Sequence, residues 1–446
     1  MRDFVTSGAE GGGRRYFGTD GIRGVAGDDL TAELVEKIGR AAALWAQKIA
    51  KSGEGSDLGH VLIGRDTRGS GPELEHALAA GIASAGGTAV LAGVLPTPAV
   101  ALLADELGAI VTASHNPPEY NGVKILGARG RKLTDEEEEA IESLLDAPGG
   151  DGGAIERVED ATERYLDHVL GHFGSDLAGL RIAVDCANGA FSAIAPQAFA
   201  SLGAEVHAIG VEPDGTNINV GCGATDLTAL GQKVLETGCD LGVAFDGDGD
   251  RMLAVDERGE PLDGDQILAI LALSLEVRLV AVTVMTNLGF HRLMEERGIE
   301  VVTTPVGDRY VLEALHREGG VLGGEQSGHV IWLREHVAGD GLVAALLLCG
   351  ALRGHTPGGR ALSEAASVLR LYPQATRNVP VSRRELPPTV LDEAARLGEE
   401  LGERGRVLVR PSGTEPVVRV LVEAETAQVA GEICARIARL VAQELG

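Results

Sequence analysis

The sequence predicts an α/β fold: three similar mixed-sheet α/β domains followed by a smaller C-terminal α+β domain. The chain of 446 residues has room for two to four domains of ordinary size. Strand–helix–strand patterns occur three times along it, and a proline-containing stretch separates them from a last segment with its own pattern. We expect the domains to span residues 1–150, 151–252, 253–368 and 369–446.

The three repeated units share one order of elements. An apolar strand leads into a helical stretch and then into a second apolar strand, over residues 60–94, 181–211 and 279–306. Each unit is followed, usually after one more helix, by an apolar strand that ends in a polar loop, over residues 109–117, 241–251 and 319–329. Ligands bind at strand ends in α/β sheets, so these loops are expected to carry the function.

The last segment begins near LRLYPQATRNVPVS at residue 369. Its proline-containing entry and the later ELPPTV stretch are typical of a linker region that leads into a separate unit. The strand-like sequence RVLVRPSGTEPVVRVLVEA over 406–424 belongs to this unit.

Composition and charge narrow the class of protein. The net charge of −27 argues against a nucleic acid or an anionic membrane surface as the main partner, and the longest apolar runs are too short to span a bilayer. Five cysteines, none at Cys-x-x-Cys spacing, favour neither a disulfide framework nor a zinc knuckle. We therefore expect a cytoplasmic protein whose partner is a small molecule, and a monomer or homodimer.

The loop FDGDGDR at 245–251 carries Asp246, Asp248 and Asp250 at a spacing of two. This spacing places the three carboxylates on one side of an extended segment. Two carboxylates about 5 Å apart repel by roughly 3 kcal/mol at an effective dielectric of 20, and a hard divalent cation relieves that repulsion. Mg²⁺ is therefore predicted here. A calcium loop is the rival, with Glu257 at its twelfth position, but Arg251 stands at the position that requires glycine.

Ser114 stands in the loop TASHNP, with Lys124 ten residues further on. In an extended chain Ser114 and His115 point to opposite faces, which makes His115 poorly placed as the base of a catalytic triad. A serine near a divalent ion and a lysine suits phosphoryl transfer, in which Lys124 moves a proton at the sugar oxygen. The plain alternatives are a turn serine and a surface lysine.

RPSGTEP at 410–416 predicts a phosphate cradle. Hydroxyls and backbone N–H groups in a tight loop, flanked by arginines, are suited to a phosphate dianion, and an ordinary β-turn is the alternative. The residues concerned are Arg410, Ser412, Gly413, Thr414 and Arg419.

Two further loops carry weaker signals. GGEQSGH supplies Glu325, Ser327 and His329, which can form hydrogen bonds with sugar hydroxyls. GTDGIRG at 18–24 is a glycine-rich turn that places Arg23.

Together these motifs resemble the α-D-phosphohexomutase superfamily, and within it the bacterial members that act on glucosamine phosphates. The resemblance covers nearly the whole chain from about Phe17, and eight motifs occur in the order of the family. The motifs are FGTDGIRG, PTPAVA, TASHNP with NGVK, NINVGCGATD, FDGDGDR, VGDRYV, GGEQSGH and RPSGTEP.

The resemblance implies four domains around a central cleft and a phosphate carried on Ser114. It implies one Mg²⁺ per subunit, held by that phosphate and by Asp246, Asp248 and Asp250. The implied reaction interconverts glucosamine 6-phosphate and glucosamine 1-phosphate through a sugar 1,6-bisphosphate, and so supplies amino-sugar precursors for cell-wall synthesis.

The resemblance also assigns the remaining site residues. It places Lys124 and Arg23 beside the transferred group, and Arg251, a substrate-binding candidate, close to the metal loop. His115 and His329 are two further catalytic candidates. The candidates for sugar binding are Glu325, Ser327 and Asp308, and the loop at 412–414 is assigned to the phosphate that does not react.

The substrate rests on fewer residues than the reaction. Asp308 stands where relatives that act on mannose or glucose tend to carry histidine, and Gln326 also matches the glucosamine group. Thr112 and Pro118 depart from the family pattern, so packing around the serine loop is expected to differ. Phosphomannomutase or phosphoglucomutase activity is the near alternative. A Mg²⁺-dependent sugar phosphatase and a sugar-phosphate-binding protein without turnover are more distant ones.

Overall fold

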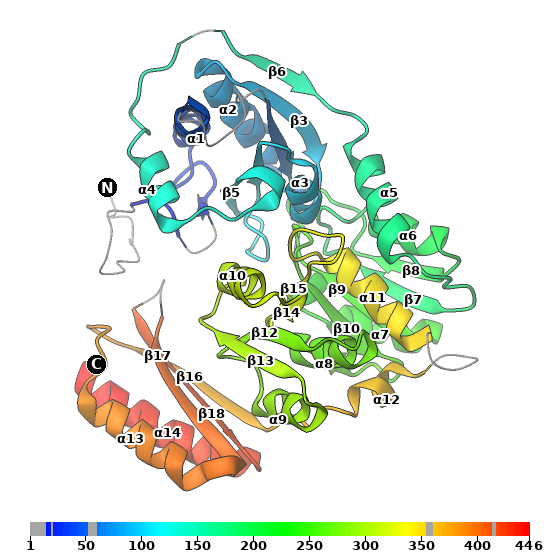
Figure 1. Ribbon diagram of the computed structural model, residues 1–446, viewed down its shortest axis with the longest axis vertical. Helices are drawn as coiled ribbons and strands as arrows, with labels where there is room; N and C mark the ends of the chain where they lie inside the picture. The colour runs from blue at the N-terminus through cyan, green and yellow to red at the C-terminus, as the bar shows by residue number, and fades with distance from the viewer. Residues whose placement is uncertain (1–14, 19–20, 52–59, 151, 354–359, 413–415) are drawn as a thin grey trace. The chain divides into compact units, whose positions relative to one another are not determined.

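The computed structural model describes residues 15–18, 21–51, 60–150, 152–353, 360–412 and 416–446. These residues form two compact units, and most of their helices and strands are labelled in Figure 1. The larger unit comprises the described residues up to Met285 together with residues 299–368, and the smaller unit comprises residues 286–298 and the described residues from Leu369 onward. No helix within the described ranges is long and apolar enough to cross a membrane.

The first sheet lies between residues 22 and 157. Its elements are β1 (Ile22–Val25), α1 (Ala32–Lys51), β2 (His60–Arg65), α2 (Gly71–Ser84), β3 (Thr88–Val94), α3 (Thr97–Leu103), β4 (Leu107–Val111), β5 (Tyr120–Leu126), the 3₁₀ turn η1 (Ala128–Gly130), α4 (Asp135–Glu142) and β6 (Ala154–Arg157). The strand order is β1-β5-β4-β2-β3-β6, and β5 is antiparallel to both of its neighbours. Aliphatic side chains of α1, α2 and the strands form its core.

The second sheet lies between residues 181 and 262. Its elements, with the helix that precedes them, are α5 (Ala161–Phe173), β7 (Arg181–Asp185), α6 (Ala195–Ser201), β8 (Glu205–Ile209), η2 (Gly223–Thr225), α7 (Thr228–Thr237), β9 (Leu241–Phe245), β10 (Met252–Asp256) and β11 (Pro261–Leu262). The strand order is β11-β10-β9-β7-β8. β7, β8 and β9 are parallel, whereas β10 returns antiparallel to β9.

The third sheet has four strands in the larger unit. Its elements in that unit are α8 (Gly264–Ser274), β12 (Leu279–Thr283), β13 (Glu300–Thr304), α10 (Asp308–Glu318), β14 (Leu322–Gly324), β15 (Val330–Trp332), α11 (Gly341–Arg353) and α12 (Leu362–Ala366). The strand order is β13-β12-β14-β15, with β15 antiparallel to β14.

These three sheets contain the same parallel core, ordered β4-β2-β3, β9-β7-β8 and β14-β12-β13. In each, the last parallel strand turns through a polar loop into an antiparallel partner, and the loops cover residues 112–119, 246–251 and 325–329. The threefold repeat and the fold class are thus confirmed. The return strand β10 confirms the expectation that MLAVDE, after the acidic loop, forms a strand. The return strands β5 and β15 were not predicted, because they are buried along nearly their whole length and lack the alternation of a half-exposed strand.

The smaller unit contains a three-stranded antiparallel sheet ordered β16-β18-β17. Its elements are α9 (Leu288–Arg297), β16 (Gln374–Pro380), α13 (Pro388–Leu401), η3 (Gly402–Arg404), β17 (Gly405–Pro411), β18 (Val417–Ala424) and α14 (Ala427–Leu445). Apolar side chains of α13, α14 and the strands form its core. α9 belongs here although its sequence lies between β12 and β13, and Leu288 N donates to Glu423 Oε2 at 3.1 Å.

Candidate active site

Ser114 lies in the loop between β4 and β5 and has an uncommon backbone conformation. Its φ angle is 51°, in the left-handed region that residues other than glycine rarely adopt. Its amide donates to Thr112 Oγ1 at 2.8 Å, and its Oγ donates to Asp246 Oδ2 at 2.6 Å. The turn therefore points the buried hydroxyl of Ser114 at the acidic loop between β9 and β10.

His115 lies closer to the hydroxyl of Ser114 than the sequence suggested. The expectation that the two side chains point to opposite faces is wrong, because the left-handed turn at Ser114 replaces an extended backbone. His115 Nδ1 lies 3.3 Å from Ser114 Oγ. Burial and the charges of Arg251 and Arg23 lower the pKa of His115 to about 4, so the ring is neutral near pH 7.

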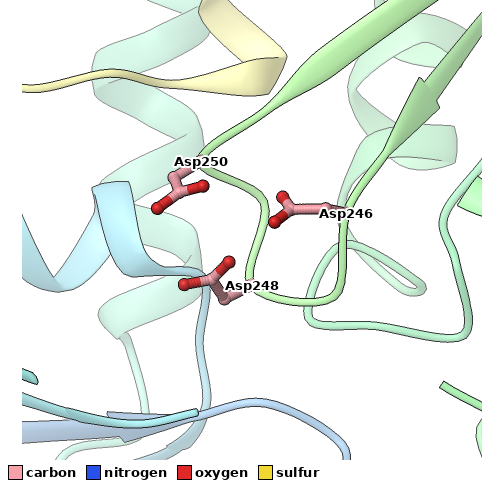
Figure 2. Close-up of side chains that lie close together, drawn as sticks. All are labelled: Asp246, Asp248 and Asp250. Carbon is pink, nitrogen blue, oxygen red and sulfur yellow. The ribbon is translucent and has the colours of Figure 1, made fainter. Parts of the chain in front are cut away.

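The three aspartates of the second loop converge on one point, as Figure 2 shows. Carboxylate oxygens of Asp246, Asp248 and Asp250 lie within 4.8 Å of one another, and all three residues are buried. The loop is a tight turn rather than the extended segment that we expected. Gly249, with φ 78°, donates its amide to the carbonyl of Asp246 at 3.1 Å. The turn brings the carboxylates together by a different backbone geometry.

A calcium loop of the helix-flanked type is excluded by the surrounding elements. The loop connects two paired strands, β9 and β10, in which Phe245 pairs with Met252. Glu257 lies beyond β10 and accepts a hydrogen bond from the amide of Ser363 at 3.2 Å.

The donor set of this loop fits a hard divalent cation. Burial, together with the charges of Asp248 and Asp250, raises the pKa of Asp246 well above its usual range. Among the described residues, Asp248 Oδ1 is buried and has no hydrogen-bond partner. A buried carboxylate oxygen in this situation is costly unless a cation binds it, and all-oxygen sites suit Mg²⁺. The residues present therefore fit Mg²⁺.

Lys124 extends from β5 into the same cluster. Its Nζ lies 2.9 Å from Asp248 Oδ2 and 3.1 Å from Asp250 Oδ2. Burial by itself would raise the pKa of Asp250, but the charges of Lys124, His329 and Arg251 outweigh burial and hold that pKa well below its usual range. Lys124 thus brings a cation into contact with two of the three carboxylates.

The third loop adds a histidine between two carboxylates. His329 is buried, with Nδ1 3.7 Å from Asp250 Oδ1 and Nε2 3.5 Å from Asp308 Oδ2. Burial lowers the pKa of His329, but Asp250 and Asp308 outweigh it and raise the pKa to about 9. Glu325 Oε1 accepts a hydrogen bond from the amide of Gly307 at 3.0 Å, which connects this loop to the start of α10.

The remaining candidates of the larger unit lie at different depths. Arg251 donates its amide to Asp246 Oδ1 at 3.1 Å, and its Nε lies 4.0 Å from Asp250 Oδ1. Arg23 is half-buried on β1, where it pairs with Gly122 of β5. Ser327 is exposed in the third loop. Arg23 lies on β1, Arg251 follows β9 and Ser327 follows β14, so these candidates come from segments far apart in the sequence.

The phosphate-cradle candidates belong to the smaller unit. Arg410 on β17 and Arg419 on β18 are direct cross-strand partners, and burial and the charge of Arg419 lower the pKa of Arg410. The amide of the buried Ser412 donates to the carbonyl of Val417 at 2.8 Å. Like charges opposite each other destabilise a sheet, and a bound anion relieves that repulsion. Gly413 and Thr414 lie outside the described residues.

Sequence reasoning gave no role to four residues that contact the serine or metal loops. Thr97 Oγ1 donates to Asp248 Oδ2 at 2.7 Å, and Asn219 Nδ2 donates to the Ser114 carbonyl at 2.9 Å. The other two, Asp66 and Arg68, follow β2 and lie beneath the serine loop. Thr97 and Asn219 belong to the motifs PTPAVA and NINVGCGATD. These motifs supported the family resemblance, but their residue types did not indicate a role for either side chain.

Comparison with known proteins gives the same order of domains. The chain matches the phosphoglucomutase/phosphomannomutase family profiles of α/β/α domain I over residues 14–149 and α/β/α domain II over residues 163–259. α/β/α domain III matches over residues 263–372 and the C-terminal domain over residues 378–440.

Curated relatives match along almost their entire length. A phosphoglucosamine mutase of Thermobifida fusca is 46% identical, with 97% of this chain and 99% of the relative covered. A phosphoglucosamine mutase of Rhodococcus jostii is 47% identical, with 96% and 99% covered.

Solved structures share the fold. A phosphoglucomutase/phosphomannomutase family protein from Burkholderia thailandensis superposes with a TM-score of 0.80 at 26% identity, covering 96% of this chain and 97% of the other. An N-acetylphosphoglucosamine mutase of Aspergillus fumigatus, solved with GlcNAc-6P and magnesium, has a TM-score of 0.66 at 19% identity, covering 98% and 97%, and shows a likeness of fold. The resemblance read from the motifs is confirmed, and the chain belongs to the phosphoglucomutase/phosphomannomutase family of the phosphohexomutases.

Proposed function

We propose that this protein interconverts glucosamine 6-phosphate and glucosamine 1-phosphate through a phosphoserine at Ser114 and a sugar 1,6-bisphosphate. The observation that carries the proposal is the 2.6 Å hydrogen bond from Ser114 Oγ to Asp246 in the acidic cluster. A serine hydroxyl held against three converging carboxylates suits metal-assisted phosphoryl transfer. Relatives named phosphoglucosamine mutase at 46% and 47% identity favour the amino sugar.

The transfer balances as a displacement at phosphorus. The bond between phosphorus and Ser114 Oγ breaks, a bond from phosphorus to a sugar hydroxyl oxygen forms, and the hydroxyl proton, moved by Lys124 at the sugar oxygen, ends on Ser114 Oγ. The bisphosphate then returns its other phosphoryl group to Ser114 by the reverse steps. Lys124 is assigned this role because it is buried beside the cluster and lies on the strand that follows the serine loop.

Asp246, Asp248 and Asp250 would hold one Mg²⁺ together with a phosphate oxygen on Ser114. The ion would supply positive charge against the oxygens of the transferred group. We assign Arg251 and Arg23 the same role, that of placing positive charge beside the oxygens of the transferred phosphoryl group. His115 is assigned to the serine oxygen, because its neutral ring lies 3.3 Å from it.

Substrate-binding roles are assigned within each unit separately. We assign the sugar to Glu325, Ser327 and Asp308, with His329 fixed between Asp308 and Asp250. Carboxylates suit the ammonium group of glucosamine, which glucose and mannose lack. We assign the phosphate that does not react to the cradle of Arg410, Ser412, Gly413, Thr414 and Arg419. Domains spanning 1–150, 151–252, 253–368 and 369–446 remain part of this proposal.

Two other activities compete with it. Phosphomannomutase or phosphoglucomutase activity is favoured by the family name itself and requires the same chemistry. A phosphatase would use the same serine and metal and would release phosphate to water. The paired arginines of β17 and β18 favour a mutase, because a phosphatase has no need of a second phosphate site.

³¹P NMR distinguishes these activities. Purified protein would be mixed with Mg²⁺, a trace of sugar bisphosphate and glucosamine 6-phosphate, with glucose and mannose 6-phosphates in parallel samples. We expect a sugar 1-phosphate signal that grows fastest with glucosamine and is lost in Ser114→Ala. A sugar 1-phosphate signal that grows faster with glucose or mannose 6-phosphate would contradict the assignment of glucosamine as the substrate. A growing signal of inorganic phosphate would mean that the protein is a phosphatase and not a mutase.

A further inference from the structure

Arg68 is a buried arginine whose side chain forms hydrogen bonds with the backbone of the serine loop. Its side chain is 0% exposed. Nη2 donates to the carbonyls of Ser114 at 2.9 Å and Asn116 at 2.8 Å. Nη1 donates to the carbonyls of Pro117 and Tyr120. Nε donates to Asp66 Oδ2 at 2.9 Å, so the five N–H donors of the guanidinium face five acceptors.

Asp66 contacts the same loop near its start, through Thr112. Its Oδ2 also accepts a hydrogen bond from Thr112 Oγ1 at 2.6 Å, and Thr112 Oγ1 accepts from the amide of Ser114 at 2.8 Å. Arg68 therefore holds the carbonyl of Ser114, while Asp66, acting through Thr112, holds its amide. The left-handed φ of Ser114 is fixed from both sides of the residue.

Asn219, from the loop before η2, holds two of the same carbonyls. Its Nδ2 donates to the Ser114 carbonyl at 2.9 Å and the Asn116 carbonyl at 3.3 Å. Asn219 is itself left-handed, with φ 59°. The backbone of Gly247, in the metal loop, packs so closely that a Cβ there would lie 2.7 Å from the Ser114 carbonyl oxygen. The carbonyl that Arg68 binds is thus also in contact with the second-sheet part of the chain.

Thr67 and Gly69, which alternate with Asp66 and Arg68 along the chain, form hydrogen bonds with loops of the second sheet instead of the serine loop. Thr67 Oγ1 donates to the carbonyl of Asn188, and the amide of Gly69 donates to the carbonyl of Gly215 at 2.8 Å. Segment 66–69 therefore connects the serine loop, through its even-numbered residues, with loops of the second sheet, through its odd-numbered ones.

We propose that Arg68 and Asn219 are positioning residues that set the distance between Ser114 and the metal loop, with segment 66–69 as the connection between the first two sheets. The inference rests on the proposed function. In the step concerned, Ser114 Oγ forms a bond to a phosphoryl phosphorus of the bisphosphate, the bond from that phosphorus to the sugar oxygen breaks, and the seryl proton ends on that oxygen. This step requires the hydroxyl at a fixed place, and a displacement near 1 Å costs on the order of 100-fold in rate.

The test compares four variants of the full chain. Arg68→Met keeps the length of the side chain but removes its five donors, and Arg68→Lys restores some of them. Asn219→Gly removes the amide yet tolerates a left-handed φ. Arg258→Met is the matched control, because Arg258 is 65% exposed and binds Asp256 away from the loop.

The decisive readout is the single-turnover rate at which dephosphorylated protein takes a phosphoryl group from glucose 1,6-bisphosphate with Mg²⁺, followed by intact mass. We expect a loss of about 100-fold in Arg68→Met, a smaller loss in Arg68→Lys and roughly 10-fold in Asn219→Gly, with Arg258→Met unchanged. The KM for glucosamine 6-phosphate should change far less than kcat. A merely structural role would instead lower the amount of folded protein and leave the rate per folded molecule intact.

Hydrogen exchange over residues 112–120 separates this inference from the proposed function. Faster exchange in Arg68→Met and Asn219→Gly, but not in Arg258→Met, would support the positioning role. It would do so even if the wild-type protein took up no phosphate, because failure to take up phosphate would contradict only the proposed function. Wild-type rates and wild-type exchange in folded Asn219→Gly and Arg68→Lys would overturn the inference. If Arg68→Met does not fold, those two variants decide.

Discussion

The acidic cluster of the larger unit and the arginine pair of the smaller unit both gather like charges, but they surround them differently. Asp246, Asp248 and Asp250 are buried, and Lys124 lies against two of them. Arg410 and Arg419 face each other across two strands and are half-buried. On the proposed function, the groups assigned to the reaction are fixed by buried opposite charges, whereas the arginines assigned to the second phosphate stay half-buried, where a ligand can reach them.

The largest expected effect lies at the buried cluster. Ser114→Ala removes the oxygen proposed to carry the phosphoryl group, so mutase activity should fall by roughly 10⁴-fold or more. Coupled assays of sugar 1-phosphate formation measure the loss, and thermal unfolding checks that the variant is folded. Activity within tenfold of the wild type would mean that Ser114 does not carry the phosphate.

The next effect concerns the cation of Lys124. In Lys124→Met the three carboxylates lose the ammonium group that contacts two of them, so the protein without metal should unfold at a lower temperature. Mg²⁺ should then raise Tm more in Lys124→Met than in the wild type, because the ion relieves a larger repulsion.

Thermal unfolding with and without Mg²⁺ measures both shifts, and kcat should fall by about 100-fold or more. Lys37→Met is a control, because Lys37 is 36% exposed and pairs with Glu33 on the same helix, α1. Equal Mg²⁺ shifts in the wild type and Lys124→Met would contradict the assignment of Lys124 to the cluster's charge.

A smaller effect is expected in the arginine pair. A charge-assisted hydrogen bond contributes about 1.5–3 kcal/mol, so Arg410→Ala or Arg419→Ala should raise KM for the sugar phosphate roughly 10- to 100-fold. Thermal stability should stay the same or rise slightly, because a like-charged cross-strand pair is removed. Steady-state kinetics with Arg377→Ala, an exposed arginine of β16, as the control measure the effect. An unchanged KM would contradict the assignment of the substrate's second phosphate to this sheet.

The smallest effect is a pH dependence of the smaller unit. Burial and the charge of Arg406 lower the pKa of His291 from 6.5 to about 4. The neutral ring is favoured in the folded state, so this stability is fully present above pH 6.5 and is lost as the pH falls toward about 4.

Thermal unfolding between pH 7 and about pH 5 should therefore show a smaller loss of Tm in His291→Phe than in the wild type. His316→Gln, an exposed histidine of α10, is the control. The same pH dependence in His291→Phe and the wild type would contradict the effect of burial.

Much of this molecule could be predicted from local sequence. The parallel strands and the three loops were predictable, because apolar runs and the polar residues that follow them are neighbours in the chain. The grouping of the three aspartates was also predictable, although the turn at Gly249 was not.

The support of the serine loop could not be predicted. The acceptors of Arg68 in that loop are carbonyl groups 46 to 52 residues away, and backbone carbonyls leave no mark on the sequence. The proximity of His115 to Ser114 depends in the same way on a left-handed φ that this network holds.

The most direct test of the central claim is to locate the phosphate on the chain. The protein would be incubated with glucosamine 1,6-bisphosphate and Mg²⁺, digested, and its peptides analysed by mass spectrometry. The account predicts one phosphoryl group, on Ser114, that disappears when excess glucosamine 6-phosphate is added and is recovered in sugar bisphosphate. Turnover of glucosamine 6-phosphate without any phosphate on Ser114, or with phosphate on another residue, would contradict it.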